Sequence, residues 1–416
     1  MWIPPLAAIG VRLAVLAARP QAPETFEYDE LARNLLGGRG YVLEHLGVPY
    51  RGYASGLVYT GLTTAFYALG AAGPEVLRLF QFVIAAATTL AVAVITARLG
   101  GSRHAAIAAG LLVGVHPALV YYDVRKLHPL GLDALLFAAL IALLLSSRRA
   151  SGWACVAGGI LLGAGILERL TLVAVAPLAL LGFAVDMPRR DRARRAAVFT
   201  GAMLLTVAPW LVRNHLVFGA PLASTMSAEY FFLGNVPPSQ GSCLLPSGER
   251  VIDAAPPAFL DRLSAADERG QGRIFREAST EYVATQPIRF AFGLARKLVY
   301  FWTWAPQTGV LYPASYRRAY LVLYTALSLA ALLGARRLWR LSPMSRRGLV
   351  WIAVACLGVS CLQAAFYVEL RHRWALEPLL VVLAVFAVPA IFAIRSEAPA
   401  EHSAGTARRS DAGGPR

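Results

Sequence analysis

The feature that most constrains the fold is a series of apolar blocks, each close to the length needed to cross a bilayer. A membrane-spanning helix needs about 20 mostly apolar residues, and ten such blocks follow one another along the 416-residue chain. They are residues 3–18, 77–97, 104–121, 130–146, 153–167, 170–185, 195–216, 316–335, 347–367 and 374–394. Charged residues make up only 15% of the chain, whereas a soluble globular domain has about 25%. The sequence therefore predicts an all-α polytopic membrane protein with about ten transmembrane helices.

Two further stretches, 56–71 and 288–305, are apolar and aromatic. We expect them to be interfacial or re-entrant helices in the outer loops, because spanning helices there would move the arginine-rich loops to opposite sides. The first block, 3–18, lacks the basic start and the clean cleavage site of a signal peptide, so we expect it to be the first span.

Arginine-rich loops predict the orientation. The loops near 98–103, 147–152, 186–195 and 336–347 contain fourteen arginines against two carboxylates, Asp186 and Asp191. These arginines are Arg98, Arg103, Arg148, Arg149, Arg189, Arg190, Arg192, Arg194, Arg195, Arg336, Arg337, Arg340, Arg346 and Arg347. Such loops stay in the cytoplasm, so we expect a multi-pass protein of the cytoplasmic (inner) membrane with both termini inside. The net charge of +16 follows from these loops and does not indicate a nucleic-acid partner.

The blocks predict one multi-span membrane domain over residues 1–395. It includes an outer loop, 19–55, and an outer segment, 217–287, which has eight carboxylates and five arginines. We expect this segment to cover a site and to help select a substrate. Residues 396–416 are small, polar and aperiodic, which predicts a disordered cytoplasmic tail.

The outer loop gathers acid directly behind the first span, where Glu24, Glu27, Asp29 and Glu30 fall within seven positions. Residues 27–37 have helical spacing, with Tyr28, Leu31, Leu35 and Leu36 on one face and Glu27, Glu30 and Asn34 on the other, and Gly37-Gly38 ends the helix. A helix lying on the membrane with solvated carboxylates, or acids near a helix N-terminus, would explain the cluster without any catalytic role.

Basic residues and a further acid lie at the same predicted face. Arg51, between Tyr50 and Tyr53, suits either an interfacial anchor or a phosphate group, which a guanidinium binds in bidentate fashion. The candidate binding groups are Arg51, Tyr53, Arg125, Lys126, Arg371 and Arg373. Asp133 falls about one turn into its span, where a membrane carboxylate is either a functional group or a structural cap.

The position of these groups bears on function. They lie at outer helix ends, whereas an ion-coupled transporter places charges midway, at broken helices, and often has internal repeats. The pattern favours a site at the membrane–water boundary, where a lipid-borne phosphate substrate meets a polar one. A lipid-linked sugar flippase or other transporter is the main alternative. A non-catalytic scaffold is the weaker one, and it predicts that Glu24, Asp133 and Arg51 do not converge.

Five segments, in order, resemble the family C glycosyltransferases. EYDELARNLLGGRGY, preceded by Glu24, is similar to their first outer loop. The others are ILERLTLVAVAPLALL (166–181), APWLVRNHLVFGAPLASTMSAEYFFLGN (208–235), YVATQPIRFAFGLARKLVYFW (282–302) and LRHRWALEPLL (370–380). The closer resemblance is to the bacterial family 39-like branch, with the protein O-mannosyltransferases and the lipid A aminoarabinose transferase.

The resemblance implies an enzyme of the GT-C fold that moves a sugar, hexosyl or pentosyl, from a polyprenyl-phosphate carrier to an acceptor at the outer face of the cytoplasmic membrane. It places a catalytic acid at Glu24, where the family usually has Asp, with Glu27 or Asp29 as alternatives, and a second carboxylate at Asp133. It implies that Arg51 meets the carrier phosphate and that Lys297 holds the lysine position of a P-x-R-F…K-L motif.

The chemistry suits these residue types. A carboxylate can take the proton of an attacking hydroxyl or amine, and arginines can neutralise the leaving phosphate. Polyprenyl phosphate is already a good leaving group, so we expect no required cofactor and regard a divalent cation as optional; no metal ligands are predicted. The expected partners are the lipid-linked donor, a glycan, lipid or protein acceptor, and membrane lipids.

Overall fold

The protein is an all-α polytopic membrane protein. The computed structural model describes residues 2–70, 73–146, 152–184 and 188–388. The predicted tail, 396–416, lies outside the described residues, as do Arg148, Arg149 and Asp186.

Each predicted apolar block lies on a helix or on two consecutive helices. These are α1 (Ile3–Ala18), α4 (Gly73–Arg98), α5 (Arg103–Gly114) with α6 (Pro117–Arg125), α7 (Leu130–Ser146), α8 (Gly152–Glu168), η2 (Leu170–Val175) with α9 (Ala176–Ala184), α10 (Arg189–Phe218), α15 (Ala314–Leu341), α16 (Pro343–Ala364), and α17 (Leu370–Trp374) with α18 (Glu377–Val385). Among the described residues, four helices are individually long and apolar enough to cross a membrane, and α5 with α6, bent by 47°, makes a fifth. Four shorter apolar helices of 10–17 residues join them. The last block is described only as far as residue 388.

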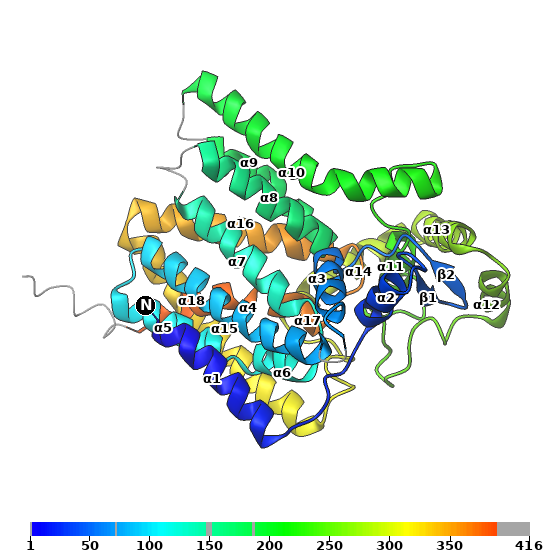
Figure 1. Cartoon of the computed structure of the whole chain (residues 1–416), viewed down its shortest axis with the longest axis horizontal. Helices are drawn as coiled ribbons and strands as arrows, with labels where there is room; N and C mark the ends of the chain where they lie inside the picture. Colours follow the sequence, from blue (N-terminus) through cyan, green and yellow to red (C-terminus); the bar gives the residue numbers. More distant parts are fainter. Residues whose placement is uncertain (1, 71–72, 147–151, 185–187, 389–416) are drawn as a thin grey trace, which may run out of the picture.

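The remaining elements gather at one end of the helix bundle, on the right in Figure 1. They are α2 (Glu27–Leu36), β1 (Leu43–His45), β2 (Val48–Tyr50), α3 (Leu57–Tyr67), α11 (Ser227–Asn235), α12 (Pro257–Ser264), α13 (Glu268–Thr285) and α14 (Pro287–Trp302). We call α2, α3, the two strands and α11–α13 the cap. The cap thus joins the predicted outer loop to the predicted outer segment, and its segment from α11 to α13 has a small apolar core around Phe232 and Phe275.

The two arginine-rich loops that the structure describes in full, between α4 and α5 and between α15 and α16, lie at the opposite end of the bundle (Figure 1). The hydroxyl of Ser345, in the first turn of α16, donates to the carbonyl of Leu99 at 2.8 Å, which joins the loop after α4 to the loop before α16. α10 also begins at this end. These two loops and the start of α10 therefore share one face, as the positive-inside pattern predicts. The assignment of that face to the cytoplasm stays a prediction.

Close helix packing explains the glycines of α8. A Cβ on Gly159 would lie 2.4 Å from the carbonyl oxygen of Phe199 in α10, and one on Gly163 would lie 2.6 Å from Cβ of Thr206. Two glycines four residues apart let helix backbones approach closely, as in many membrane helix pairs. α10 has Pro209 inside it, and nearly all of its apolar residues are half-buried or exposed. Its described contacts with α8 fix its place beside the bundle.

The expectation that charges lie only near helix ends was wrong for Arg12. This arginine is buried within α1 and pairs with Asp123 of α6, Nη2 to Oδ2 at 2.7 Å. It also donates to the carbonyl of Gly114 at 2.7 Å. The α5–α6 break at residues 115 and 116 interrupts the helical hydrogen bonds, and Arg12 satisfies a carbonyl freed there. The Arg12–Asp123 pair is structural, because both side chains have hydrogen-bond partners within the protein.

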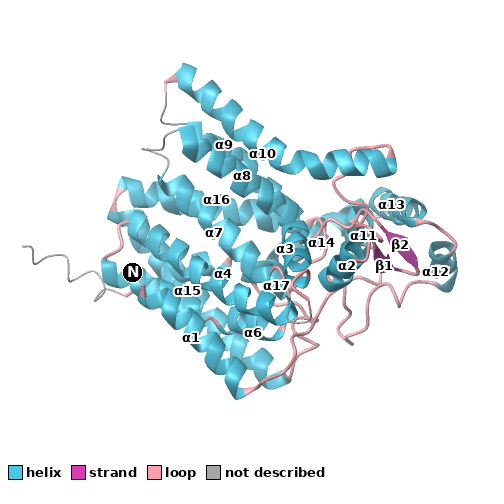
Figure 2. Ribbon diagram, in the orientation of Figure 1, coloured by secondary structure: helices cyan, strands magenta, loops and turns pink. Residues whose placement is uncertain are grey.

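Two local expectations also differ from the structure. In α2, Asn34 is buried and donates to the carbonyl of Val42 at 2.6 Å, whereas Leu35 and Leu36 are exposed. The predicted amphipathic faces were therefore wrong at the end of this helix, because the cap covers its polar side. Figure 2 shows the single described hairpin, β1 with β2, which no pattern in the sequence predicted. Its turn residues, Leu46 and Gly47, have φ of 48° and 78°, as a two-residue hairpin turn requires.

Candidate active site

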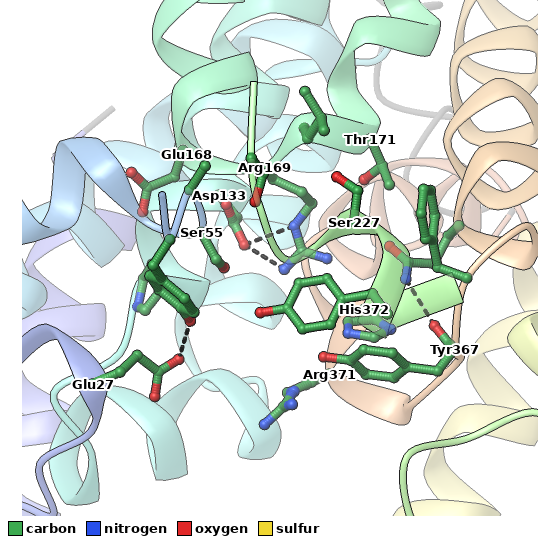
Figure 3. Close-up of a pocket in the computed structure, with 18 of the residues that line it drawn as sticks. Glu27, Ser55, Asp133, Glu168, Arg169, Thr171, Ser227, Tyr367, Arg371 and His372 are labelled. Atoms are coloured by element: carbon green, nitrogen blue, oxygen red, sulfur yellow. Dashed lines mark hydrogen bonds and ion pairs between the residues drawn. The ribbon is translucent and has the colours of Figure 1, made fainter. Parts of the chain in front are cut away.

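A polar cavity of about 160 Å³ lies between the cap and the adjoining end of the bundle. Figure 3 shows that α2, the ends of α7 and α8, α11 and α17 all direct side chains toward it. The polar residues that line it are Glu27, Tyr28, Tyr53, Ser55, His128, Asp133, Glu168, Arg169, Thr171, Ser224, Ser227, Tyr230, Gln363, Tyr367, Arg371 and His372. We call this space the polar cavity. It combines three carboxylates with two guanidinium groups.

Glu27, the first residue of α2, is one wall of the polar cavity. The hydroxyl of Tyr53 donates to its Oε1 at 2.5 Å. Burial first, and the Glu27 carboxylate second, raises the pKa of Tyr53 well above its ordinary value. The phenol is therefore protonated at neutral pH and acts as a fixed donor that orients the carboxylate.

Gly56 allows the loop behind Tyr53 to pack against Tyr28. Its φ is +67°, and a Cβ there would lie 2.3 Å from Cε1 of Tyr28. Glycine adopts this conformation without strain. The backbone N–H of Gly56 donates to the carbonyl of Glu168 at 2.9 Å, so this turn also connects the outer loop to the end of α8.

Asp133, in the first turn of α7, forms an ion pair with Arg169 at one wall of the polar cavity. Nε of Arg169 donates to Oδ2 of Asp133 at 2.9 Å, and its Nη2 contacts the same oxygen. Asp133 is only 2% exposed, and its Oδ1 has no hydrogen-bond partner within the described parts of the chain. A charged pair with one oxygen left over is a ready acceptor for a ligand hydroxyl.

Glu168, the last residue of α8, is also buried at this wall. Its Oε2 accepts the backbone N–H of Tyr59 at 2.9 Å, in the first turn of α3, where the helix dipole favours an anion. Its Oε1 and the hydroxyl of Thr171 have no partner in the described residues. Burying an unpaired polar atom costs about 1–3 kcal/mol, so three such oxygens on one wall point to a polar ligand.

α17 supplies the basic side of the polar cavity. Nε of Arg371 pairs with Oε2 of Glu369 at 2.9 Å, and the thiol of Cys243 donates to the other oxygen of Glu369 at 2.6 Å. The backbone N–H of Glu369 donates to Nδ1 of His372 at 3.2 Å. Glu369 thus holds both cavity-lining residues of α17.

His128 and His372 are neutral donors at the same site. Burial, and after it nearby arginines, lowers the pKa of each imidazole well below its ordinary value. Nδ1 of His128 accepts the backbone N–H of Leu130 at 3.2 Å, as Nδ1 of His372 accepts that of Glu369. A neutral imidazole carries one proton, so in each ring that proton is assigned to Nε2.

Four predicted site residues, Glu27, Tyr53, Asp133 and Arg371, line the polar cavity together. Glu24 does not: its Oε2 lies 2.9 Å from Nζ of Lys126, and its side chain is 49% exposed. Its backbone bridges Arg125 and Leu127, while the half-buried Arg125 ends α6 outside the lining. The Glu24–Lys126 pair thus attaches the chain before α2 to the α6–α7 loop.

Asp29 and Arg51 also lie outside the lining. Asp29 pairs with Arg33 one turn later at 2.9 Å and accepts the hydroxyl of Tyr67 at 2.7 Å. The backbone N–H of Arg51 donates to Glu268 at 2.8 Å, while its side chain is exposed. The expected convergence of Glu24, Asp133 and Arg51 on one cavity is therefore not seen.

Lys297 and Arg373 are each 1% exposed and make internal contacts. Nζ of Lys297 donates to Oδ1 of Asn235 at 2.7 Å and to the carbonyl of Phe366 at 2.8 Å. Arg373 pairs with Glu377 at 3.0 Å and donates to the carbonyl of Phe301 at 2.9 Å. Both side chains connect helices.

Two further spaces are lined by elements that also line the polar cavity. A cavity of about 420 Å³ in the cap shares Glu27, Tyr53, Tyr230 and Tyr367 with it. An apolar groove of about 460 Å³ runs between α6, α15 and α17 and is lined by Pro117, Ala118, Tyr121, Gly309, Tyr312, Tyr316, Arg317, Ala319, Tyr320, Leu323, Leu370 and Trp374. α17 thus has Leu370 and Trp374 on the groove and its central basic residues on the polar cavity.

No family model and no curated protein matches the chain. Solved structures do match. The oligosaccharyltransferase of Archaeoglobus fulgidus, in the apo form, is similar at a TM-score of 0.51 and 13% sequence identity, over 91% of this chain. The chain has the GT-C fold. It spans 50% of the length of that oligosaccharyltransferase.

Two structures of ArnT from Cupriavidus metallidurans are also similar. The one bound to undecaprenyl phosphate has a TM-score of 0.42 and 17% identity, and the match covers 86% of this chain and 76% of that chain. The apo state has a TM-score of 0.38 and 18% identity, with 89% and 77% covered. The predicted GT-C fold is confirmed, and the closer placement in the family 39-like branch stays a prediction.

Several residues of this GT-C cavity were not among the predicted site residues. They are Glu168, Arg169, Tyr230, Gln363 and His372. Glu168 and Arg169 have one signal in the sequence: they form an acid–base dipeptide, in ILERL, at the end of an apolar block. Such a dipeptide is equally typical of a helix boundary. Among the described residues, no three His, Cys, Asp or Glu side chains are grouped as metal ligands.

Proposed function

We propose that the chain is a membrane glycosyltransferase that moves a hexosyl or pentosyl group from a polyprenyl-phosphate carrier to a glycan, lipid or protein acceptor. The proposed site is the polar cavity, at the outer face of the cytoplasmic membrane. The observation that carries the proposal is that Glu27, Asp133 and Glu168 line the same cavity as Arg169 and Arg371, at the end of a GT-C bundle.

The donor phosphate is proposed to bind at α17. Arg371 and the Nε2–H groups of His128 and His372 are donors on one side of the polar cavity. The prenyl chain would lie in the apolar groove, which Leu370 and Trp374 line on the same short helix. A lipid chain in the groove and its phosphate in the cavity are thus separated by one turn of helix.

The sugar is proposed to sit against the opposite wall. There Oδ1 of Asp133, Oε1 of Glu168 and the hydroxyl of Thr171 are buried and have no partner in the described chain. Hydroxyl groups of a sugar are donors that would satisfy these acceptors. Arg169 would hold Asp133 in place through their ion pair.

The proposed reaction is a single displacement. The acceptor oxygen or nitrogen bonds to the anomeric carbon while the bond from that carbon to the phosphate oxygen breaks, and the electron pair leaves with polyprenyl phosphate. Glu27 takes the acceptor proton, because it is the one of the three polar-cavity carboxylates that also lines the cap cavity, and the neutral donor Tyr53 orients it. The acceptor would approach through the cap cavity, which shares Glu27 with the polar cavity.

The proposed roles need no cofactor. Arg371 can stabilise the charge that develops on the leaving phosphate, and a divalent cation stays optional. Residues 1–395 are proposed to work as one membrane domain.

The test uses protein in lipid nanodiscs with a panel of labelled polyprenyl-phosphate monosaccharides. We expect Glu27→Gln to reduce transfer about 10²–10⁴-fold, the usual share of general-base catalysis. Glu277→Gln is the matched control, because Glu277 makes only an exposed ion pair with Arg262 on the cap. Loss of activity in Glu24→Gln, with Glu27→Gln fully active, would move the base to Glu24. Carrier flipping without transfer from any donor would instead favour the transporter alternative.

A further inference from the structure

A fourth space, the α14 cavity, lies between α14 and the loop after α11. Its volume is about 580 Å³, and it shares no lining residue with the polar cavity. Arg289, Phe292 and Arg296 of α14 form one side, and Ser239 and Gln240 form the other. No aspartate or glutamate lines it, so its charge is wholly positive.

α14 lies with one apolar face uncovered. Ile288, Phe292 and Val299 are 73%, 73% and 57% exposed, at the spacing of one helix face. The opposite face is fixed inside the protein, where Lys297 and Phe301 are buried. A helix with one buried face and one uncovered apolar face, next to a membrane bundle, suits the headgroup–acyl boundary of a bilayer.

The two arginines are positioned to bind an anion at that boundary. Arg289 and Arg296 are seven residues apart, so they project from the same side of α14, and both are exposed. Neither has a carboxylate partner among the described residues, and the one described contact is that of Arg296 with the ring of Tyr300, 5.9 Å from the centroid. Arg33, Arg169 and Arg371 all have carboxylate partners. Two unpaired guanidinium groups over one cavity form a site for a phosphate group.

We propose that this cavity binds the phosphate of an anionic phospholipid, held by Arg289 and Arg296, with the acyl chains along Ile288, Phe292 and Val299. The headgroup would occupy the space between α14 and Ser239–Gln240. An anionic lipid is favoured over a zwitterionic one, because no acidic side chain in the cavity could pair with a choline or ethanolamine cation. The site is independent of the proposed transferase chemistry.

Native mass spectrometry of the full chain, stripped of lipid in detergent, tests the proposal. We expect the protein to bind phosphatidylglycerol, and Arg289→Gln with Arg296→Gln to weaken this binding about 10–30-fold, since each basic residue near a membrane surface contributes about 1 kcal/mol. Phosphatidylcholine binding should be weaker and unchanged by the double variant. The Arg289→Lys and Arg296→Lys pair, which keeps the charge but loses the bidentate geometry, should fall between the two.

The matched control is Arg262→Gln with Arg276→Gln, which removes the same charge from exposed positions of the cap. It should bind phosphatidylglycerol like the wild type. Equal binding of phosphatidylglycerol and phosphatidylcholine, or wild-type affinity in the Arg289/Arg296 variant, would overturn the proposal. Full competition by millimolar inorganic phosphate would also overturn it, because the site would then recognise free phosphate rather than a lipid. Because both arginines are exposed, the Arg289/Arg296 variant should lose lipid binding while it keeps the melting temperature and the elution volume of the wild type.

Discussion

The hydroxyl of Tyr53 donates to Oε1 of Glu27 at 2.5 Å, on the wall shared by the polar cavity and the cap cavity. This contact joins the end of the outer loop to the first turn of α2 within the same loop. Oε2 of Glu27 takes no part in this hydrogen bond. The Glu27 side chain lines both the polar cavity and the cap cavity. A base that must meet an acceptor from one space and a donor sugar from the other would occupy this position.

Tyr53→Phe should therefore reduce kcat more than it weakens acceptor binding. The ring would still fill its buried place, so the fold should lose only about 1 kcal/mol, the usual net value of one hydrogen bond. We expect kcat to fall about tenfold, because the carboxylate loses its orienting donor, with little change in the acceptor KM. Steady-state transfer kinetics measure kcat and the acceptor KM. An increase in KM alone would show that Tyr53 binds the acceptor and does not position Glu27.

Glu168 should have separable structural and functional roles. Its Oε2 accepts the N–H of Tyr59 at the start of α3, and a glutamine oxygen can do the same. We expect Glu168→Gln to keep the melting temperature but to reduce transfer at least tenfold, because the unpaired acceptor oxygen at the cavity wall becomes an amide NH2, which can only donate. Glu168→Ala should also lose about 1–3 kcal/mol of stability through the unsatisfied N–H. Equal melting temperatures for the two variants would contradict the structural role.

The sequence could predict the membrane architecture because burial in lipid imposes a strong length and hydropathy requirement. The blocks at 77–97 and 316–335 fall inside α4 and α15, and Gly37 ends α2 as predicted. Glu27, Asp133 and Arg371 were predictable as candidates, because ionisable residues beside spans are few. Which of Glu24 and Glu27 lines the polar cavity was not predictable, because it depends on the ion pair that Lys126 makes with Glu24.

The rest of the site depends on contacts between distant segments. Arg169 meets Asp133 across 36 residues of sequence, and no local pattern encodes that pairing. The β1–β2 hairpin was missed because two strands of three residues are too short for a periodicity to be recognised. Arg12 was missed as a buried charge because its partners, Asp123 and the carbonyl of Gly114, come together only at the α5–α6 bend.

Lys297 should make stability depend on pH. Burial, and after it the charge of Arg296, lowers the pKa of Lys297 from 10.5 to about 7. Between these values the unfolded chain binds more protons than the folded one, so the free energy of unfolding from this residue rises with pH, by at most about 1.4 kcal/mol per pH unit. We expect the melting temperature of the wild type to rise from pH 7 to pH 9 relative to that of Lys297→Gln. Parallel pH profiles for the two proteins would show that Lys297 keeps its proton across this range.

Arg371 and Arg373 lie on the same short helix, yet we expect substitution of Arg371 to reduce activity and substitution of Arg373 to reduce stability. Arg371 is 33% exposed and lines the polar cavity, so we expect Arg371→Gln to fold normally and to reduce transfer about 10²–10³-fold through loss of charge stabilisation. Arg371→Lys should restore part of the activity.

Arg373 is buried against Glu377, and removing one partner of a buried pair costs about 3–5 kcal/mol. Arg373→Gln should therefore lower the melting temperature, and any protein that still folds should keep its affinity for the donor. Melting curves and donor titrations on the same preparations separate the two. A stable Arg373→Gln protein with weakened donor binding would place the phosphate at Arg373, and would move the proposed donor site to the groove side of α17.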